Sequence, residues 1–522
     1  MSLVVLSPSA RPAVEDASNP QYGGTLHLGT YRKPAPFNPF AVTETITSPL
    51  MDLVFSKLIQ RNANGDFEPD LAERWEVSGD GLAYTFYLRH DVRFHDGTPL
   101  TSKDVVKTFE SYSNRQLSPY FSDYFNMVKE WRTPSDFIFQ AVLKEPFSPF
   151  LISIWRAWIS PSKYLKTYRR TEGWKDVIGS GPFIFEGQDP SGDLRLKANK
   201  NYYKGKPYLD EIYVKLYPLK SHVWSAFLRG DIDMVHYLDR KNYEEIKENP
   251  SFRVFRILQR GGYLLMFNLK DSLLSNPHIR QVISLAINRE EILTHSDGGE
   301  GVLLNGPFDP FLSDFSSQGN PSIFFDPILA KSILAQEGFT ENDRMMERNG
   351  QKLILRLLVE PENESLIQIA KLIRQQLQEV GIGLDLQFFT DDRKLREILS
   401  PANPNFQCYL FTYGYGTDPD IASRYWQSNG AFNWSGYKNA EVDALLKAAR
   451  KDRSAAERMK KYERIQKIIS EERLAIFLYI PYVYHVVSKK VGNVHKLFGP
   501  FVPFFRLSKV YLKENRSDKG GD

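Results

Sequence analysis

The residues of this chain that could carry out catalysis are its histidines, its single cysteine and its carboxylates. The nine histidines form neither an HExxH motif nor a Cys/His spacing that assembles a catalytic zinc site. His90 and His95 flank a tight strand connection, where we expect structural hydrogen bonds. The single cysteine, Cys408, lies in the apolar run FQCYLF, which gives no sign of an activated thiolate. We therefore expect no metal, no cofactor and no nucleophilic cysteine.

Two further enzyme signatures are missing from the sequence. There is no GxSxG nucleophile elbow, and the glycine-rich stretch at 179–183, GSGPF, lacks the Lys-Ser/Thr ending of a phosphate-binding loop. Asp418 and Asp420, in a DPD tripeptide, could supply the paired carboxylates of a glycosidase. Because carboxylates in such a loop more often cap turns, an exported hydrolase is only an alternative. The residue types favour binding over catalysis, and we predict that the protein is not an enzyme.

An aromatic and polar cluster, YGYGTDPDIASRYWQSNGAFNW, occupies residues 413–434. Its glycines permit close approach of a ligand to the backbone, and its aromatic side chains offer large apolar faces with polar edges. This combination suits an adaptable binding pocket, and the structural alternative is an aromatic-rich corner between domains. The candidate ligand contacts here are Tyr413, Gly414, Tyr415, Asp418, Trp426 and Trp434.

Length and composition exclude several classes of protein. A chain of 522 residues is too long for one ordinary core, so two or three domains are expected. The hydrophobic and charged fractions, 42% and 25%, are typical of a soluble globular protein. The 67 basic and 63 acidic residues nearly balance and form no long basic run, which argues against nucleic acid as a partner. One cysteine excludes an internal disulfide.

The sequence contains no apolar run long enough for a transmembrane helix, which needs about 18 residues. Near the N-terminus only residues 3–6 are apolar, without a basic n-region, so a signal peptide is not evident. Residues 1–21 are rich in Ser, Pro and Ala, and we predict that they form a flexible leader.

The most informative stretch is Tyr84 to Val106, YTFYLRHDVRFHDGTPLTSKDVV. Alternation of apolar and polar residues predicts a strand at its start, and Asp-Gly pairs before and after that strand predict tight turns. Thr101 with Asp104 three residues later forms a capping box that should open a helix. The stretch is expected to fold as strand, strand and helix.

Other segments also carry clear signals of secondary structure. Strands are predicted within 22–30, 212–217, 263–268 and the tail 484–512. Helices should begin after Asn276, at Asp326 and at the capping box Ser454–Glu457, and an apolar stripe from Leu366 to Val380 should end at Gly381.

Several motifs, in order along the chain, resemble the extracellular solute-binding protein family 5, the oligopeptide- and dipeptide-binding receptors of bacterial ABC importers. The resemblance runs from about Tyr22 to Leu512 and depends on the set rather than on any single motif. The matching motifs are PDLAERWEV at 69–77, DG-x-x-YTF-x-LR at 80–89, FHDG at 94–97, GSGPF at 179–183, GDID at 230–233, HIRQVISLAINREEIL at 278–293 and ILAQEGF at 333–339.

The resemblance implies an α/β fold of the two-lobed periplasmic-binding-protein type II (cluster C), with an extra domain on the first lobe. Lobe 1 (domain I) would comprise 22–48, 171–265 and 486–514, the extra domain II 49–170, and lobe 2 (domain III) 266–485. The implied function is the substrate-binding component of an ABC import system, which captures a solute by closure of the lobes and delivers it to a membrane permease. A peptide is the favoured solute, and a nickel chelate or an oligosaccharide is the alternative. We expect an exported monomer, periplasmic or at the cell surface.

The resemblance also implies ligand contacts outside the aromatic cluster. Lys33 and Pro34 would lie in the first cleft loop, Tyr120 in a loop facing the ligand backbone, and Tyr263 on a strand near the change of lobe. The alternatives are a proline-stiffened surface loop and a packed aromatic. Peptide receptors of the family place an aspartate before the DP motif for the peptide's ammonium group, but Tyr415 stands there and Asp418 belongs to the motif itself. This departure, with Lys33 where an acidic residue can occur, favours a blocked peptide, an anionic ligand or a shifted role for Asp418.

Overall fold

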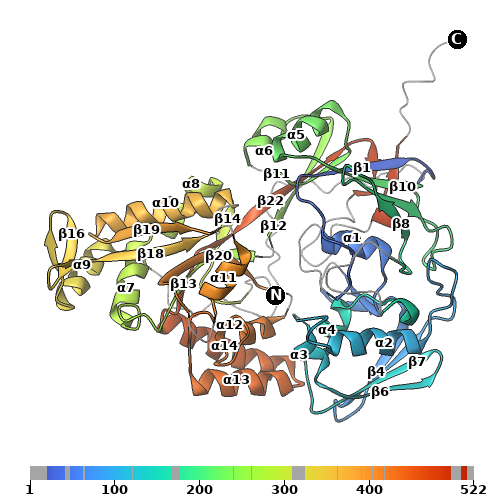
Figure 1. The fold of residues 1–522 in the computed structure, drawn as a ribbon, viewed down its shortest axis with the longest axis horizontal. Helices are drawn as coiled ribbons and strands as arrows, with labels where there is room; N and C mark the ends of the chain where they lie inside the picture. The colour runs from blue at the N-terminus through green and yellow to red at the C-terminus, as the bar shows by residue number, and fades with distance from the viewer. Residues whose placement is uncertain are drawn as a thin grey trace, which may run out of the picture. The chain divides into compact units, whose positions relative to one another are not determined.

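The computed structural model describes residues 20–40, 47–62, 65–119, 121–165, 177–238, 240–259, 261–308, 324–360, 363–389, 391–400, 404–416, 418–494 and 507–513 (Figure 1). The predicted leader lies outside these residues, apart from its last two positions. The chain divides into two compact units. Unit 1 consists of Met1–Glu145, Phe150–Ile257 and Val483–Asp522, and unit 2 of Pro146–Pro149 and Leu258–Tyr482. The finer three-domain boundaries stay a prediction.

The large sheet of unit 1 is built around β1 (Thr25–Thr30), which runs parallel to both β10 (Glu211–Leu216) and β11 (Met234–Leu238). Every second residue of β1 is buried, which is the period of a strand with one face on a core. The strand predicted from GGTLHLGT is thus confirmed. The strand order is β12 (Phe252–Leu258), β22 (Tyr479–Ser488), β11, β1, β10, β9 (Leu194–Ala198) and β8 (Phe183–Gln188). β22 begins in unit 2, which extends to Tyr482, and there its first residues pair with β14 (Gly301–Leu303).

The strand predicted at the start of the most informative stretch is β5 (Ala83–Leu88), which lies in an antiparallel sheet of unit 1. β5 pairs with β4 (Ala72–Val77) and β7 (Ile138–Leu143), and β6 (Val128–Ser135) completes the sheet. The helix α2 (Ser102–Ser113) begins where expected, because the Asp104 carboxylate accepts a hydrogen bond from the Thr101 backbone N–H at 3.0 Å. The strand expected after β5 is reduced to one isolated bridge between Arg93 and Pro99.

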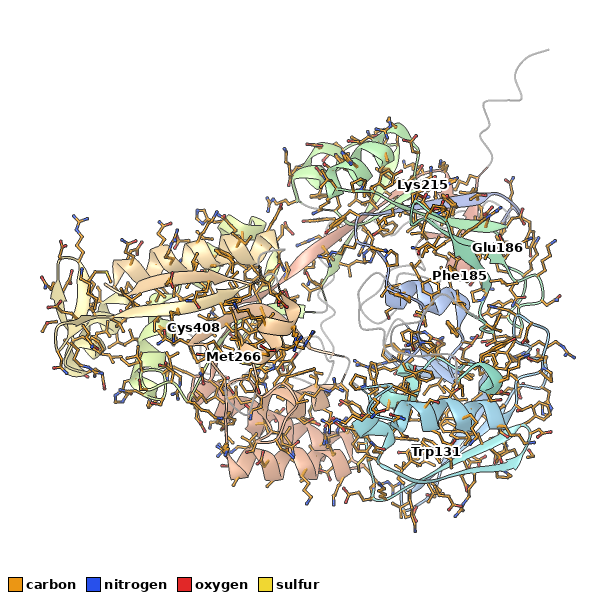
Figure 2. All side chains as sticks on the ribbon, in the orientation of Figure 1. Trp131, Phe185, Glu186, Lys215, Met266 and Cys408 are labelled. Carbon is orange, nitrogen blue, oxygen red and sulfur yellow. The ribbon has the colours of Figure 1, made fainter. Side chains whose placement is uncertain are left out.

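The main sheet of unit 2 has five strands and is covered on both faces. Its order is β19 (Gly383–Phe388), β18 (Ile354–Val359), β20 (Cys408–Gly414), β13 (Gly261–Phe267) and β21 (Ala475–Phe477). Leu265 and Phe267 belong to one core, whereas Leu264 and Met266 belong to the core on the opposite face. A strand that is buried on both faces has a continuous run of apolar residues. The sequence at 263–268 has such a run, and it predicts this strand correctly. Figure 2 labels Met266 on β13 and Cys408 on β20, which are neighbouring strands of this sheet.

Helices flank this sheet in two groups, each belonging to one of the two cores. The first group is α7 (Pro277–Ala286), α8 (Arg289–Asp297), α9 (Pro327–Gln336) and α10 (Glu364–Glu379), and the second is α12 (Ala422–Trp426), α13 (Ala440–Lys451) and α14 (Ala455–Glu471).

The predicted helix ends of unit 2 are confirmed by their capping bonds. The Asn276 side chain accepts from the His278 N–H at 2.9 Å, and Asp326 accepts from the Leu329 N–H at 2.8 Å. The stripe of α10 stops before Gly381, whose φ of 80° suits glycine. No helix among the described residues is long and apolar enough to cross a membrane.

The remaining helices and strands are short. They are α1 (Thr47–Val54), β2 (Ile59–Arg61), β3 (Phe67–Pro69), α3 (Ser122–Phe125), α4 (Phe150–Arg156), α5 (Lys220–Arg229), α6 (Arg240–Ile246), β15 (Thr340–Asn342), β16 (Met345–Arg348), β17 (Gln351–Lys352), α11 (Asp392–Ile398), β23 (Val491–Gly492) and β24 (Tyr511–Leu512).

Candidate functional site

The loop after β1 carries two of the predicted contact residues in unit 1. The side chain of Lys33 is exposed, whereas Pro34 is buried. Thr30, the last residue of β1, accepts a hydrogen bond from the Arg32 N–H at 3.1 Å and donates one to the Arg32 carbonyl at 2.9 Å. At the other side of Lys33, the Ala35 N–H donates to the Thr47 hydroxyl at 2.8 Å. The loop is thus fixed on both sides of an exposed lysine.

The next residues of the same loop are anchored in the unit 1 core. Phe37 is fully buried, and its ring centroid lies 5.1 Å from that of Phe185 on β8, which Figure 2 labels. The Asn38 side chain accepts a hydrogen bond from the Phe40 N–H at 3.0 Å. Core anchoring and local hydrogen bonds, rather than prolines alone, therefore define this loop.

The aromatic cluster of 413–434 lies on one face of the unit 2 sheet. The ring centroids of Tyr413 lie 4.9 Å from Tyr415 and 4.5 Å from Tyr425, and the Tyr413 hydroxyl donates to the Pro307 carbonyl at 3.2 Å. Trp426 is fully buried in the same core. Burial raises the pKa of Tyr413 far above its ordinary value, so this phenol stays protonated. The cluster is a packed aromatic core in this structure.

Trp434 and Tyr263 occupy different positions from the centre of this cluster. Trp434 is half-buried and packs edge-on against Phe411, with ring centroids 5.3 Å apart. Tyr263 belongs to the core on the opposite face of the sheet, where its ring contacts Tyr479 at 5.1 Å. The register explains the separation, because Tyr263 pairs with Thr412 and not with Tyr413. Tyr263 is therefore not brought together with the aromatic cluster within unit 2.

Gly414 is the most exposed of the predicted contact residues in the aromatic cluster. It ends β20 opposite Gly261, and it is exposed. A Cβ atom placed on Gly414 would meet no atom within 4 Å. By contrast, Tyr413 and Tyr415 on either side of it are buried. The backbone at Gly414 is thus accessible between two buried aromatics.

The two carboxylates of the DPD loop are both engaged by arginines. Asp418 makes a two-point ion pair with Arg458 and also accepts from the Asp420 N–H at 2.8 Å. Asp420, with 1% of its side chain exposed, accepts from Arg450 Nε at 2.6 Å and Nη2 at 3.1 Å. Sequence reasoning missed both arginines, because they lie on later helices with no local signal linking them to the loop.

Burial and the charge of the opposite group shift the pKa values of the residues in these two ion pairs. Burial alone would lower the pKa of Arg458, but the charge of Asp418 outweighs it and raises that pKa above its ordinary value. Burial raises the pKa of Asp420, although Arg450 opposes the shift. Buried charges need partners of this kind, so the arrangement stabilises the loop and offers no free acid and base.

Three further candidates are the thiol of Cys408, a possible metal site and Tyr120. Cys408 is buried in β20, and burial raises the pKa of its thiol, so no reactive thiolate is expected. The described parts of the chain contain no group of three or more His, Cys, Asp or Glu side chains that could hold a metal ion. Tyr120 lies outside the described residues, and its ligand contact stays a prediction.

Comparison with known proteins gives one family match and many relatives. The family model for "Bacterial extracellular solute-binding proteins, family 5 Middle" matches residues 66–435. The oligopeptide-binding protein AppA of Bacillus subtilis (strain 168) is 26% identical over 481 residues, which are 90% of this chain and 88% of that protein. Heme-binding protein A of Haemophilus influenzae is 24% identical over 500 residues, covering 89% of this chain and 88% of that protein.

A solved structure shows the same architecture over nearly the whole chain. It is that of AppA from Bacillus subtilis in complex with a nonapeptide, with a TM-score of 0.82 and 25% identity, covering 95% of this chain and 100% of the other. This likeness confirms the α/β, two-lobed fold of the periplasmic-binding-protein type.

Proposed function

Because the chain belongs to the bacterial extracellular solute-binding proteins of family 5, we propose that it captures a peptide outside the cytoplasm and delivers it to a membrane ABC importer. The observation that carries this proposal is the match to an oligopeptide-binding protein over 90% of the chain. The family model covers 66–435, so both compact units contribute to the match.

The mechanism that we infer is closure of the two lobes around the solute. A ligand that contacts both lobes makes all its contacts only in the closed state, so binding raises the closed population. The exposed glycine of β20 suits main-chain contact with a peptide, because no side chain blocks it. Hydrolysis of ATP and passage across the membrane would be carried out by other chains, and this protein would act as an exported monomer.

An exported glycosidase is the rival function, and the geometry of the DPD loop argues against it. In a glycosidase one carboxyl group must protonate the leaving group, and the other must activate water or attack the sugar. Asp418 and Asp420 each make two hydrogen bonds to an arginine instead. This favours a binding protein over an enzyme that uses these two residues.

The test is the identity of the ligand that the protein carries when purified. The protein is denatured, and the released small molecules are analysed by mass spectrometry. We expect peptides, absent from a matched sample that was unfolded, dialysed and refolded before denaturation. Release of a tetrapyrrole, a metal chelate or a sugar instead would replace the peptide with that solute.

A second measurement separates capture from turnover. The identified ligand is incubated with excess protein, and its intact mass is followed over hours. We expect no change of mass. A new fragment that requires the folded protein, and that disappears when Asp418 and Asp420 are both changed to asparagine, would establish the hydrolase.

A further inference from the structure

Two adjacent basic residues lie at one edge of the large sheet of unit 1. Because β1 and β11 are neighbouring parallel strands, their carboxyl ends meet at the same edge. The loop after β1 presents Arg32 and Lys33 there, and both side chains are exposed. Their backbone is anchored by Thr30. In open α/β sheets, ligands bind outside the carboxyl ends of the strands.

A pair of histidines lies close to the same edge. The register pairs Gly29 with Val235, which puts His236 level with the end of β1. The His236 ring lies 4.5 Å from that of His485 on the neighbouring strand β22. Burial, then the neighbouring His485, then the positive charge of Arg32 lower the pKa of His236. The Arg32 guanidinium is therefore within electrostatic range of His236.

Arg32 and Lys33 have no acidic partner in the part of the chain that the structure describes. The exposed basic residues elsewhere in unit 1 include many with such a partner, for example Lys163 with Asp96 at 2.6 Å and Arg195 with Glu211. The positive charges of the neighbouring Arg32 and Lys33 side chains repel each other, and an anion bound between them would relieve that repulsion.

We propose that Arg32 and Lys33 bind an acidic group of the captured solute, which is a carboxylate if the solute is a peptide. The inference rests on the proposed function and narrows its substrate class. A guanidinium fork recognises a carboxylate through two parallel hydrogen bonds, and an ammonium group adds a point charge. The Thr30 and Thr47 hydrogen bonds fix the loop before ligand arrives, which lowers the entropic cost of binding.

The test compares peptides that differ by one charge. Calorimetry measures an N-acetylated nonapeptide of alanine, leucine and tyrosine with a free carboxyl terminus, the same peptide as its carboxamide, and a carboxamide with one internal glutamate. Citrate is the non-peptide anion. Each ligand is measured with the wild type, Arg32→Gln and Lys33→Gln, and with the control Lys200→Gln, which removes another exposed lysine of unit 1. Circular dichroism verifies that each variant is folded.

The wild type should bind at least one acid form about tenfold or more tighter than the neutral carboxamide, because hydrogen bonds to charged groups are the stronger ones. Arg32→Gln and Lys33→Gln should remove most of that preference, and Lys200→Gln should keep it. Equal affinity of all three peptides for the wild type overturns the inference and leaves peptide capture intact. A preference that survives both variants also overturns it.

The citrate arm separates the inference from the proposed function. If no peptide binds but citrate binds and needs Arg32 and Lys33, the anion site is supported and the peptide function fails. If neither peptides nor citrate bind at millimolar concentration, both proposals fail.

Discussion

Asp418 and Arg458 form a two-point ion pair in unit 2, with Nη2 2.5 Å from Oδ1 and Nη1 2.9 Å from Oδ2. Both side chains are 14% exposed. A carboxylate that is already neutralised by a guanidinium gains little from a second cation. Asp418 is therefore suited to holding the DPD loop, and not to replacing the ammonium-binding aspartate that the sequence lacks at Tyr415.

This pairing predicts that the amino terminus of a bound peptide is not recognised through Asp418. Wild-type protein should bind a free peptide and its N-acetylated form with affinities within about threefold, less than 1 kcal/mol. Asp418→Asn should change both affinities by the same factor, because any effect would act through the loop. Isothermal calorimetry checks both statements. A tenfold preference for the free peptide that Asp418→Asn abolishes would restore the ammonium site.

A substitution at Gly414 can test whether the ligand contacts the backbone there without disturbing the fold. A methyl group there meets no atom within 4 Å, so Gly414→Ala should leave the free energy of unfolding within about 0.5 kcal/mol of the wild type. If the ligand approaches this backbone, the same methyl group should weaken binding about tenfold or more. Gly79→Ala, also in open space, is the control. Unchanged affinity for the identified ligand would remove Gly414 from the site.

Trp426 and Tyr120 are both candidate ligand contacts, but their tests differ because only Trp426 has a known structural role. Trp426 is fully buried, so Trp426→Ala should cost about 3–5 kcal/mol of folding free energy. Its contribution to binding is better measured with Trp426→Phe, at a temperature where the variant is folded.

Tyr120→Ala should weaken binding by about 2 kcal/mol if the residue is an aromatic anchor. Wild-type affinity in both variants would leave them as structural residues.

Sequence reasoning succeeded where the signal was local. The strand at 83–88, the capping box of Thr101 and Asp104 and the glycine after α10 depend on neighbours within a few residues, and all are confirmed. The two-lobed fold came from the resemblance, and composition alone could give only two or three domains.

Contacts between distant segments could not be predicted in the same way. Asp420 and Arg450 are 30 positions apart, and nothing in the sequence pairs them. Aromatic residues suit both a pocket and a core, since both take large apolar faces. The position of Tyr263 on the other face from Tyr413 follows from a strand register, which sequence spacing does not fix.

Ligand should draw the two lobes together. The chain crosses between the compact units only near 257–258 and 482–483, besides the short segment Pro146–Pro149. Few crossings permit a hinge that absorbs the change in backbone angles. Small-angle scattering should show a smaller radius of gyration when the protein is saturated with ligand. Tight binding with an unchanged radius would contradict closure.

The hydrogen bonds of His95 favour its neutral ring, so acid should destabilise the protein. Its Nδ1 accepts from the Gly179 N–H at 3.3 Å, so the proton of the neutral ring lies on Nε2, which donates to the Gly181 carbonyl at 3.0 Å. A second proton on Nδ1 would face the Gly179 N–H, donor against donor. Burial, opposed by the Gly181 hydrogen bond and by Asp96, lowers the pKa of His95 to about 4.

The sign of the effect follows from the two pKa values. In the unfolded chain the pKa of histidine is about 6.5, so the native state binds the proton less well. The stability due to neutral His95 is complete above pH 6.5 and is lost as the pH falls towards 4, amounting to about 2.5 kcal/mol at pH 4.5. His485, whose pKa burial also lowers to about 4, adds a similar loss in unit 1.

Urea denaturation of wild type and His95→Gln at pH 7.5 and 4.5 measures this loss. Gln does not titrate, and its amide can still donate to the Gly181 carbonyl, so the variant isolates the proton. We expect the wild-type midpoint to fall more between the two pH values than that of His95→Gln. His90→Gln is the control, because His90 lies on the exposed side of the same connection and should keep the full wild-type loss. An equal fall in wild type and His95→Gln would mean that other groups govern acid stability.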